Sequence, residues 1–303
     1  MCKATRWLLM MACVLASVLL QSSAAFAQQI DFSGEWTGRT AEDRPHRGGG
    51  ADVGDYTGLP INDAARLKAD SWAAALLSAP ERQCLPHPAA YVMRGPMDMR
   101  IWKVVDPVTQ QIVAFQQRGS WMEPERTIWM DGRPHPSEHA AKTWQGFSTG
   151  QWQGNVLTVT TTHIKQGFIQ RNGVAVSDRA VVTDQYVRHG ELLTVITIVE
   201  DPVYLTEPFI RSTSWMLNPE QQGQRYPCGP NEVVVEVPRP KGQIPHHLPG
   251  TNKDLQVFAA RYGLPYEAAR GGAETLYPEY AEKMKAMRRA VSTTVPTSQQ
   301  SSR

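Results

Sequence analysis

The feature that most constrains the fold is a series of short β-type segments between Tyr91 and Val237. They are rich in β-branched and aromatic residues, and turn signals separate them at intervals of roughly 8–15 residues, which is typical of antiparallel β-structure. Two connections, His189-Gly190 and Gln153-Gly154-Asn155, are too short for a crossover helix, so the strands that they join run antiparallel. We expect strands at residues 100–105, 111–117, 126–130, 156–162, 180–188, 192–200, 209–217 and 232–237.

A further strand is expected at Gly34-Glu35-Trp36, near the start of this region. Small up-and-down barrels often carry such a Trp at their closed base, although an ordinary buried Trp in a first strand has the same pattern. About eight strands are enough to close a barrel around one small ligand. Within the segment 180–188, alternation places Asp184, Tyr186 and Arg188 on one face and Thr183, Gln185 and Val187 on the other.

Helices and loops flank the β-region. Residues 39–60 are rich in Gly, Asp and Arg and predict a surface loop. Asn62 is the expected N-cap of a helix that ends near Leu77, and further helices are expected at residues 252–262 and 278–290. Residues 292–303 are polar and lack aromatic residues, so we expect a disordered tail.

Residues 1–27 have the pattern of a secretory signal peptide, with Lys3 and Arg6 before an apolar stretch and Ala25-Phe26-Ala27 as the cleavage site. This segment holds two of the 31 basic residues and none of the 29 acidic ones, so the mature chain carries 29 of each and no formal net charge. Nucleic-acid binders need a basic excess, so we expect no nucleic-acid partner. No later apolar stretch is long enough for a membrane span. We expect a periplasmic or secreted protein.

The mature chain retains two cysteines, Cys84 and Cys228, both in proline-rich loop sequence. In an oxidising compartment two cysteines favour one disulfide. A pair of free thiols, one of them a nucleophile, is the alternative.

The segment Asp131 to His139 contains the motif H-x-x-E-H. On a helix this spacing would place His135 and His139 together as zinc ligands. Pro134 and Pro136 make a helix unfavourable here, so we predict no metal and retain these histidines only as weak candidates. A loop metal site that adds the distant His163 has no spacing signature.

Two other segments contain candidate acid/base residues. His163 and Lys165 lie two positions apart at a strand end, where they would share a face and flank a ligand carboxylate or an oxyanion. The segment that follows the strand 192–200 combines carboxylates with a phenol, which suit acid/base chemistry, although Asp-Pro also favours turns. Its candidates are Glu200, Asp201, Tyr204 and Glu207.

Eight Trp remain in the mature chain, which suits a hydrophobic or planar ligand, although core packing also explains most of them. Trp144 and Trp152, with Asp131, Arg133 and His135, are the candidate ligand-binding residues. The sequence contains no phosphate-binding loop, dinucleotide fingerprint or serine-hydrolase motif, and we expect no cofactor.

Several runs together resemble a large group of exported bacterial proteins with a lipocalin-like (calycin-type) predicted fold. They are IWMDGRPHP, TWQGFSTGQWQGNVLTVTTTHIKQG, RNGVAVSDRA, EDPVYLTEPFIRSTSW, YPCGPNE, HHLPG and RGGAETLYPEY, within roughly residues 31–280. Usual members read W-E-G-D where this chain has Trp152-Gln153-Gly154-Asn155. The resemblance implies an architecture and no mechanism. The predicted fold is therefore mainly β, an antiparallel lipocalin-like β-barrel with an N-terminal helix and C-terminal helices. We expect a signal peptide at 1–27, the barrel domain at 28–240, a helical extension at 241–291 and the tail at 292–303.

Three functional hypotheses follow. The first is a periplasmic protein that holds a small, largely apolar ligand in the barrel, with His163, Lys165, Tyr204 and the loop of Asp131, Arg133 and His135 at its mouth. The second is a cofactor-independent isomerase, lyase or hydrolase that uses the same acid/base residues. The third is an envelope protein whose C-terminal helices dock a protein partner. Fold alone does not choose between them.

Overall fold

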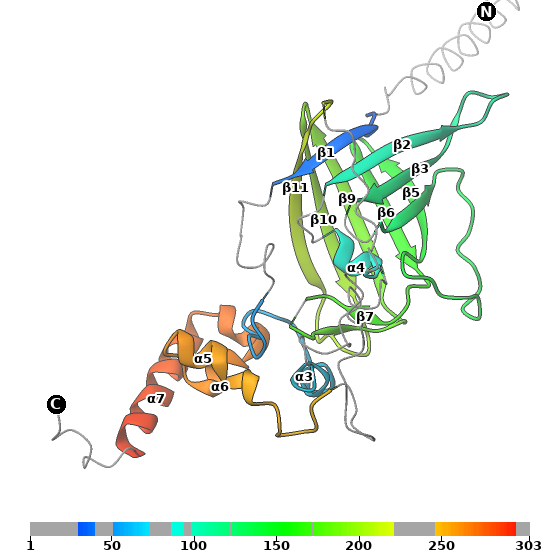
Figure 1. The fold of residues 1–303 in the computed structure, drawn as a ribbon. Coiled ribbons are helices and arrows are strands. Elements are labelled where there is room, and N and C mark those ends of the chain that lie inside the picture. The colour runs from blue at the N-terminus through cyan, green and yellow to red at the C-terminus, as the bar shows by residue number, and fades with distance from the viewer. Residues whose placement is uncertain are drawn as a thin grey trace, which may run out of the picture.

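Nine strands close into a single barrel in the order β1-β11-β10-β9-β6-β5-β4-β3-β2 (Figure 1). The computed structural model describes residues 30–39, 51–72, 86–93, 98–120, 123–170, 172–220 and 246–294. The barrel strands are β1 (Gly34–Gly38), β2 (Met99–Val105), β3 (Ile112–Gly119), β4 (Glu125–Trp129), β5 (Phe147–Gln153), β6 (Val156–Thr162), β9 (Val181–His189), β10 (Leu192–Glu200) and β11 (Phe209–Leu217). The mainly β, closed-barrel prediction is confirmed, and its architecture is compatible with a lipocalin-like fold.

The predicted strands that fall within the described residues are present with bounds shifted by at most two residues. The hairpin turns at Gly154 and Gly190 are confirmed, and both glycines have the positive φ that such turns require (60° and 59°). The segment 232–237 lies outside the described residues.

β5 is the barrel strand that none of the predicted segments covers. It pairs antiparallel with β6 but parallel with β4, so the barrel is not antiparallel throughout. A parallel pair needs a connection that returns along the barrel, and residues 130–146 provide it.

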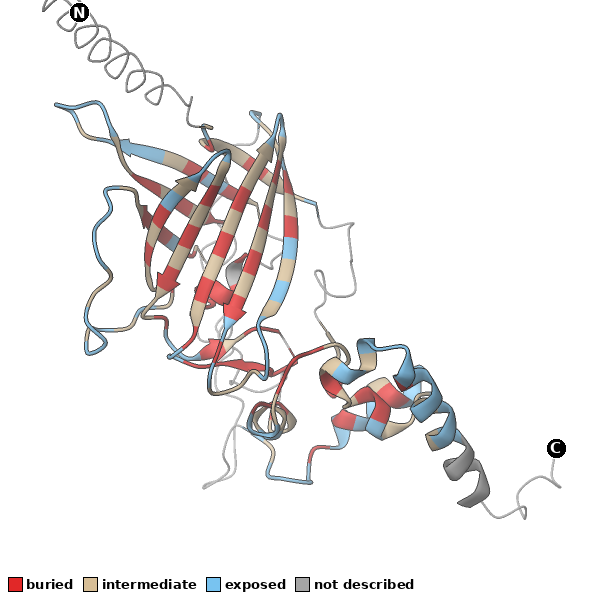
Figure 2. Ribbon diagram, turned by 180° about the vertical axis from the view of Figure 1, so that it is seen from behind, coloured by how far each residue is buried: buried red, intermediate tan, exposed pale blue. Residues whose placement is uncertain are grey.

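The barrel interior consists of two apolar clusters separated by a polar layer. Along β9 the inward residues are Val182, Asp184 and Tyr186, so the predicted division of its faces is confirmed. Along β10, Val199 and Val195 similarly flank Thr197. Figure 2 shows the resulting alternation of buried and less buried positions along these strands.

One end of the barrel is closed by aromatic residues. The indole Nε1 of Trp36 donates to the carbonyl of Phe32 (2.9 Å), and the ring of Phe32 stacks on Trp152 at 5.5 Å between centroids. Arg188 lies over the Trp36 ring, 5.2 Å from its centroid, and donates to the carbonyl of Asp31. The Trp of the G-x-W triplet therefore belongs to the closed base.

The opposite end contains a short helix, α4 (Ala89–Val92), which enters the barrel, and a two-stranded sheet of β7 (Gly167–Phe168) and β8 (Ala175–Val176) (Figure 1). Ala89 and Ala90 pack with Val182 and Val199 in the apolar cluster at this end of the barrel. Met93, directly after α4, belongs to the cluster that fills the closed half.

Helix α3 (Asp63–Asp70) begins as predicted, because the Asn62 side chain accepts from the amide of Ala65. It ends at Asp70, so the predicted end near Leu77 is wrong. The side-chain amide of Asn252 binds the carbonyls of both Asp70 and Trp72, which satisfies them without a further helical turn. Residues 51–60 form a loop as predicted, but the prediction that this loop lies on the surface is wrong, because Tyr56 and Leu59 are buried.

The C-terminal region contains η2 (Lys253–Gln256), α5 (Val257–Arg261), α6 (Tyr266–Ala269), η3 (Gly272–Leu276) and α7 (Glu279–Thr294). The helices predicted at 252–262 and 278–290 are present, and α7 continues to Thr294. Within the described ranges, no helix is long and apolar enough to cross a membrane.

Candidate ligand site in the barrel

The polar layer of the barrel is centred on a buried ion pair between Arg126 and Asp184. The distance from Nη1 to Oδ2 is 2.7 Å, and the two side chains are 4% and 0% exposed. Arg126 also donates from Nε to Ser148 Oγ (2.9 Å) and from Nη2 to Thr161 Oγ1 (2.6 Å). Thr197 donates to the second oxygen of Asp184 (2.6 Å). Each of these five side chains therefore has a partner, as burial requires.

Burial by itself would lower the pKa of Arg126, but the attraction of Asp184, followed by that of Tyr186, outweighs it and holds this pKa above its usual range. Arg126 is therefore permanently charged. A polar group that enters this layer meets a buried ion pair without net charge in a medium of low dielectric constant.

A second polar group lies between this layer and the closed end. Tyr186 donates from Oη to Gln117 Oε1 (2.6 Å), and Gln117 Nε2 donates to the sulfur atoms of Met93 (3.0 Å) and Met99 (3.2 Å). Burial, as the main cause, raises the pKa of Tyr186, so its phenol is neutral. Since sulfur is a weak acceptor, the amide of Gln117 would gain energy from a stronger one.

Two hydrogen bonds join the segment that carries Met93 to residues 144 and 145. Gln145 Nε2 donates to the carbonyl of His87 (2.6 Å), and the amide of Ala89 donates to the carbonyl of Trp144 (3.0 Å). His87 stacks on Tyr91 within the same segment, at 3.8 Å between ring centroids. α4 is therefore an insertion into the barrel and not part of its wall.

The structure brings together His135 and His163, both named from the sequence. Each has Nδ1 2.7 Å from Thr162 Oγ1, and His135 Nε2 lies 2.9 Å from Thr149 Oγ1. His163 Nε2 lies 2.8 Å from the carbonyl of Ser137, which can only accept, so this nitrogen carries the proton. With both rings neutral, Thr162 donates to His163 and accepts from His135 Nδ1, and Thr149 donates to His135 Nε2. These histidines fasten the 130–146 loop to the outer face of β5 and β6.

Lys165 does not join His163 in one site. His163 has a left-handed φ of 58°, which breaks the strand geometry that would place the two side chains on one face. Lys165 lies over the Trp144 ring, 5.3 Å from its centroid. Asp131 and Arg133 form their own exposed ion pair, and Arg133 stacks on Trp129 at 3.5 Å. These candidates lie on the outside of the barrel wall or its loop.

The four candidates after β10 do not converge either. Asp201 is buried and accepts from the amide and hydroxyl of Ser177 (2.6 and 2.7 Å), which ties β8 to this turn. Tyr204 packs in a cluster with residues of α3, and Lys68 Nζ lies 3.4 Å from its hydroxyl. Glu200 and Glu207 are exposed. The segment therefore has a structural role in the described molecule.

His139 and Glu138 are exposed and contact each other at 3.6 Å, away from His135. Among the described residues, no three His, Cys, Asp or Glu side chains form a group that could hold a metal ion. Trp152 packs against Phe32 at the closed end instead of facing a cavity. Cys84 and Cys228 lie outside the described residues.

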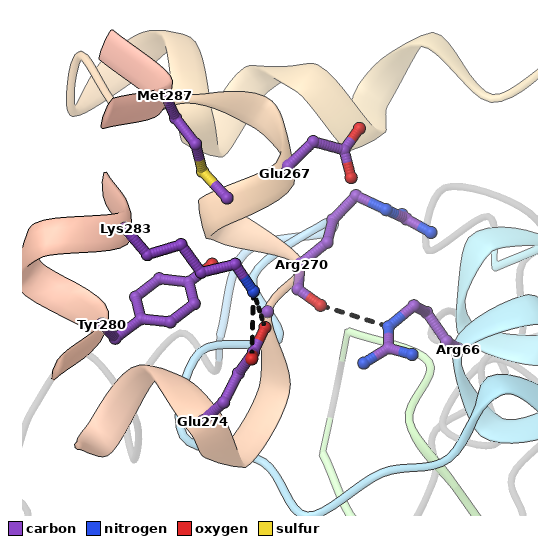
Figure 3. Close-up of a pocket in the computed structure, with 8 residues that line it drawn as sticks. Arg66, Glu267, Arg270, Glu274, Tyr280, Lys283 and Met287 are labelled. Carbon is purple, nitrogen blue, oxygen red and sulfur yellow. Dashed lines mark hydrogen bonds and ion pairs between the residues drawn. The ribbon is translucent and has the colours of Figure 1, made fainter. Parts of the chain in front are cut away.

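A separate pocket of about 470 Å³ lies between α3 and the C-terminal helices (Figure 3). Lys283 Nζ binds both oxygens of Glu274 (2.9 and 3.1 Å) across this pocket, and Arg66 Nε donates to the carbonyl of Arg270 (3.1 Å). Arg270 is itself bonded to Asp70. Because the cations of this pocket already have partners within the chain, we interpret it as part of the joint, that is, the contact between α3 and the C-terminal helices.

The interior residues Arg126, Asp184 and Gln117 are the polar groups that the sequence analysis does not single out. The alternation along β9 indicates that Asp184 shares a face with Tyr186. A carboxylate on the buried face of a strand is the sequence signal that could have predicted a polar layer inside the barrel. Arg126 is the second residue of β4, and charged residues are common near the start of a strand, so its sequence position does not indicate burial.

Comparison with protein-family models, curated proteins and solved structures finds no match. The barrel geometry is therefore the basis for the functional argument.

Proposed function

We propose that this protein is an exported binder of a small, largely apolar molecule, which it holds in the part of the barrel interior that α4 and Met93 occupy. The observation that carries this proposal is that α4 enters a barrel closed at its other end and places the Met93 sulfur against the bonded pair of Gln117 and Tyr186. The chain itself fills the position where a barrel of this size holds a ligand.

The character of the ligand follows from the groups that α4 covers. Ala89, Ala90 and Met93 pack against apolar interior residues, so most of the ligand surface is apolar. The amide of Gln117, which is bonded to Tyr186, can donate to a ligand oxygen, and oxygen is a stronger acceptor than the Met93 sulfur. A ligand with one carbonyl or hydroxyl group fits this combination.

In this scheme the ligand competes with α4, so its apparent affinity depends on the fraction of molecules with the segment displaced. Replacing Gln145 by Ala removes the bond to His87 and weakens the hold on α4. Loss of a hydrogen bond worth about 1 kcal/mol is expected to tighten apparent ligand binding about fivefold and to lower the thermal stability. The measurement is a fluorescence titration with N-phenyl-1-naphthylamine, an uncharged apolar probe.

The matched control is Asn62→Ala. Asn62 caps α3 and donates to the carbonyl of Val203 (2.8 Å), so its loss destabilises the protein without contact with α4. We expect a lower melting temperature and an unchanged dissociation constant. Binding that is equal or weaker in Gln145→Ala than in the wild type would contradict displacement of α4.

Export rests on the signal-peptide pattern of residues 1–27, and the Cys84–Cys228 disulfide depends on it. Mass spectrometry of the protein recovered from the periplasm tests both. The expected mass is that of residues 28–303 less two hydrogens, and the same spectrum under native conditions reveals a bound molecule. An uncleaved N-terminus would refute export, and two free thiols would refute the disulfide.

A further inference from the structure

The outer face of β2 and β3 carries two arginines directly opposite each other. The register pairs Arg100 with Arg118, and Trp102, two residues along β2, lies on the same outward face. The guanidinium carbons lie 5.8 and 5.9 Å from the centroid of the Trp102 ring. These three residues line a surface cavity of about 290 Å³.

Like charges in directly opposed positions destabilise a sheet. Arg100 is partly compensated by Glu35, whose Oε1 lies 3.3 Å from Nε, but its side chain is 53% exposed. Arg118 has no ion pair or side-chain hydrogen bond among the described residues, although Glu125 lies opposite it on β4. Its guanidinium lies near Trp102 instead. Within the described part of the chain, the Arg118 guanidinium therefore keeps hydrogen-bond donors that a ligand can use.

Two other contacts between an arginine and an aromatic ring include a carboxylate that binds the guanidinium through both of its oxygens. Arg133 also stacks on an outward Trp, but it binds both oxygens of Asp131. Arg270 lies over Tyr56 and binds both oxygens of Asp70. In those sites a carboxylate of the chain accompanies the guanidinium and the ring.

We infer that Arg100, Arg118 and Trp102 form a site for a small aromatic carboxylate, separate from the barrel interior. The carboxylate accepts from both guanidinium groups, which relieves their mutual repulsion and forms charge-assisted hydrogen bonds. The ring packs on Trp102. The cavity volume is close to the lower limit of roughly 300 Å³ for small-molecule pockets, which suits a one-ring molecule.

The experiment is isothermal titration calorimetry of the mature protein with three probes. Benzoate has both the ring and the charge, acetate has only the charge, and benzyl alcohol has only the ring. We expect benzoate to bind at least tenfold more tightly than either of the others. Equal affinities for benzoate and acetate, or no binding of benzoate, would overturn the inference.

Variants at three positions locate the binding. Arg118→Gln is expected to weaken benzoate binding at least tenfold, whereas Arg133→Gln, at the arginine and tryptophan pair with its own carboxylate, leaves it unchanged. Where Arg118→Gln does not fold by circular dichroism, Arg118→Lys keeps the charge and loses the planar donor pair, and a several-fold weaker affinity is expected. Wild-type affinity in the folded Arg118 variant would overturn the assignment. Gln145→Ala, which reports on the barrel interior, is expected to bind benzoate normally, so the two sites are tested independently.

Discussion

At the scale of single residues, the buried Arg126–Asp184 pair makes the stability of the barrel depend on the presence of both charged partners. Removal of one partner leaves the other charge buried and uncompensated, which typically costs about 3–5 kcal/mol. We expect Arg126→Met to lower the free energy of unfolding in urea by this amount. The control is Lys142→Met, whose 2.7 Å ion pair with Asp178 is partly exposed and contributes about 1 kcal/mol or less. Equal losses in the two variants would show that the pair does not behave as buried.

His135 gives the stability a pH dependence of known sign. Burial, and then the neighbouring His163, lower its pKa below the ordinary value of 6.5. As the pH falls through 6.5 the unfolded chain therefore binds a proton before the folded one does. The contribution of His135 is complete above this pH and decreases below it.

We expect the urea midpoint to decrease between about pH 7.5 and about pH 5.5, and to decrease less in His135→Gln. Thr149 and Thr162 can still bond to the Gln side chain, so this variant tests the titration with the polar contacts retained. The same decrease in both proteins would assign the pH dependence to other groups.

At the scale of elements, β5 shows why one strand is difficult to predict from the sequence. Its sequence FSTGQWQ contains a Gly in the middle, which is unfavourable in a strand by itself. In the structure, a Cβ at Gly150 would lie 2.6 Å from Met130 Sδ and 3.1 Å from side-chain atoms of Ile128 and Leu157. The position requires Gly because other parts of the barrel fill the space, and a local pattern does not contain that information.

Gly150→Val is therefore expected to destabilise the protein although Val favours strands. Overpacking of this kind costs about 1–3 kcal/mol. The control is Gln151→Val, one residue further on the exposed face. We expect this variant to leave the free energy of unfolding unchanged or to raise it slightly. Both are measured by urea unfolding. A neutral Gly150→Val variant would show that Met130 moves aside at no cost.

The other strands and their hairpins were predictable, because period-2 alternation and positive-φ glycines at the turns are local signals. The candidate site was much less so. His135 and His163 do meet, but the left-handed φ of His163 directs it away from Lys165. α4 lies inside the barrel because of contacts with residues far along the chain, such as Gln117 and Tyr186. Long-range contacts of this kind leave no periodic trace in the sequence.

At the scale of the whole molecule, the segment of residues 51–72 joins the barrel to the C-terminal helices. Tyr56 and Ala69 pack in a cluster with Val174, and the amide of Tyr56 donates to the carbonyl of Ala269 (2.9 Å). Two ion pairs cross the same joint: Asp70–Arg270, at 2.6 Å and mostly buried, and Asp52–Arg261, at 2.7 Å and exposed. The joint therefore offers a matched comparison of a buried and an exposed ion pair.

Arg270→Gln removes two hydrogen bonds to Asp70, whose Oδ1 also accepts from the Tyr56 hydroxyl at 2.8 Å. Loss of such charged bonds lowers the free energy of local opening by about 1.5–3 kcal/mol. Amide hydrogen exchange in residues 253–276 should therefore accelerate about 10- to 100-fold, while exchange in β9 and β10 remains slow. Arg261→Gln should change the same amides much less, because its ion pair is exposed. Acceleration that extends equally into β9 and β10 would mean that the barrel and the helices unfold as one unit, and the joint would then be part of a single core.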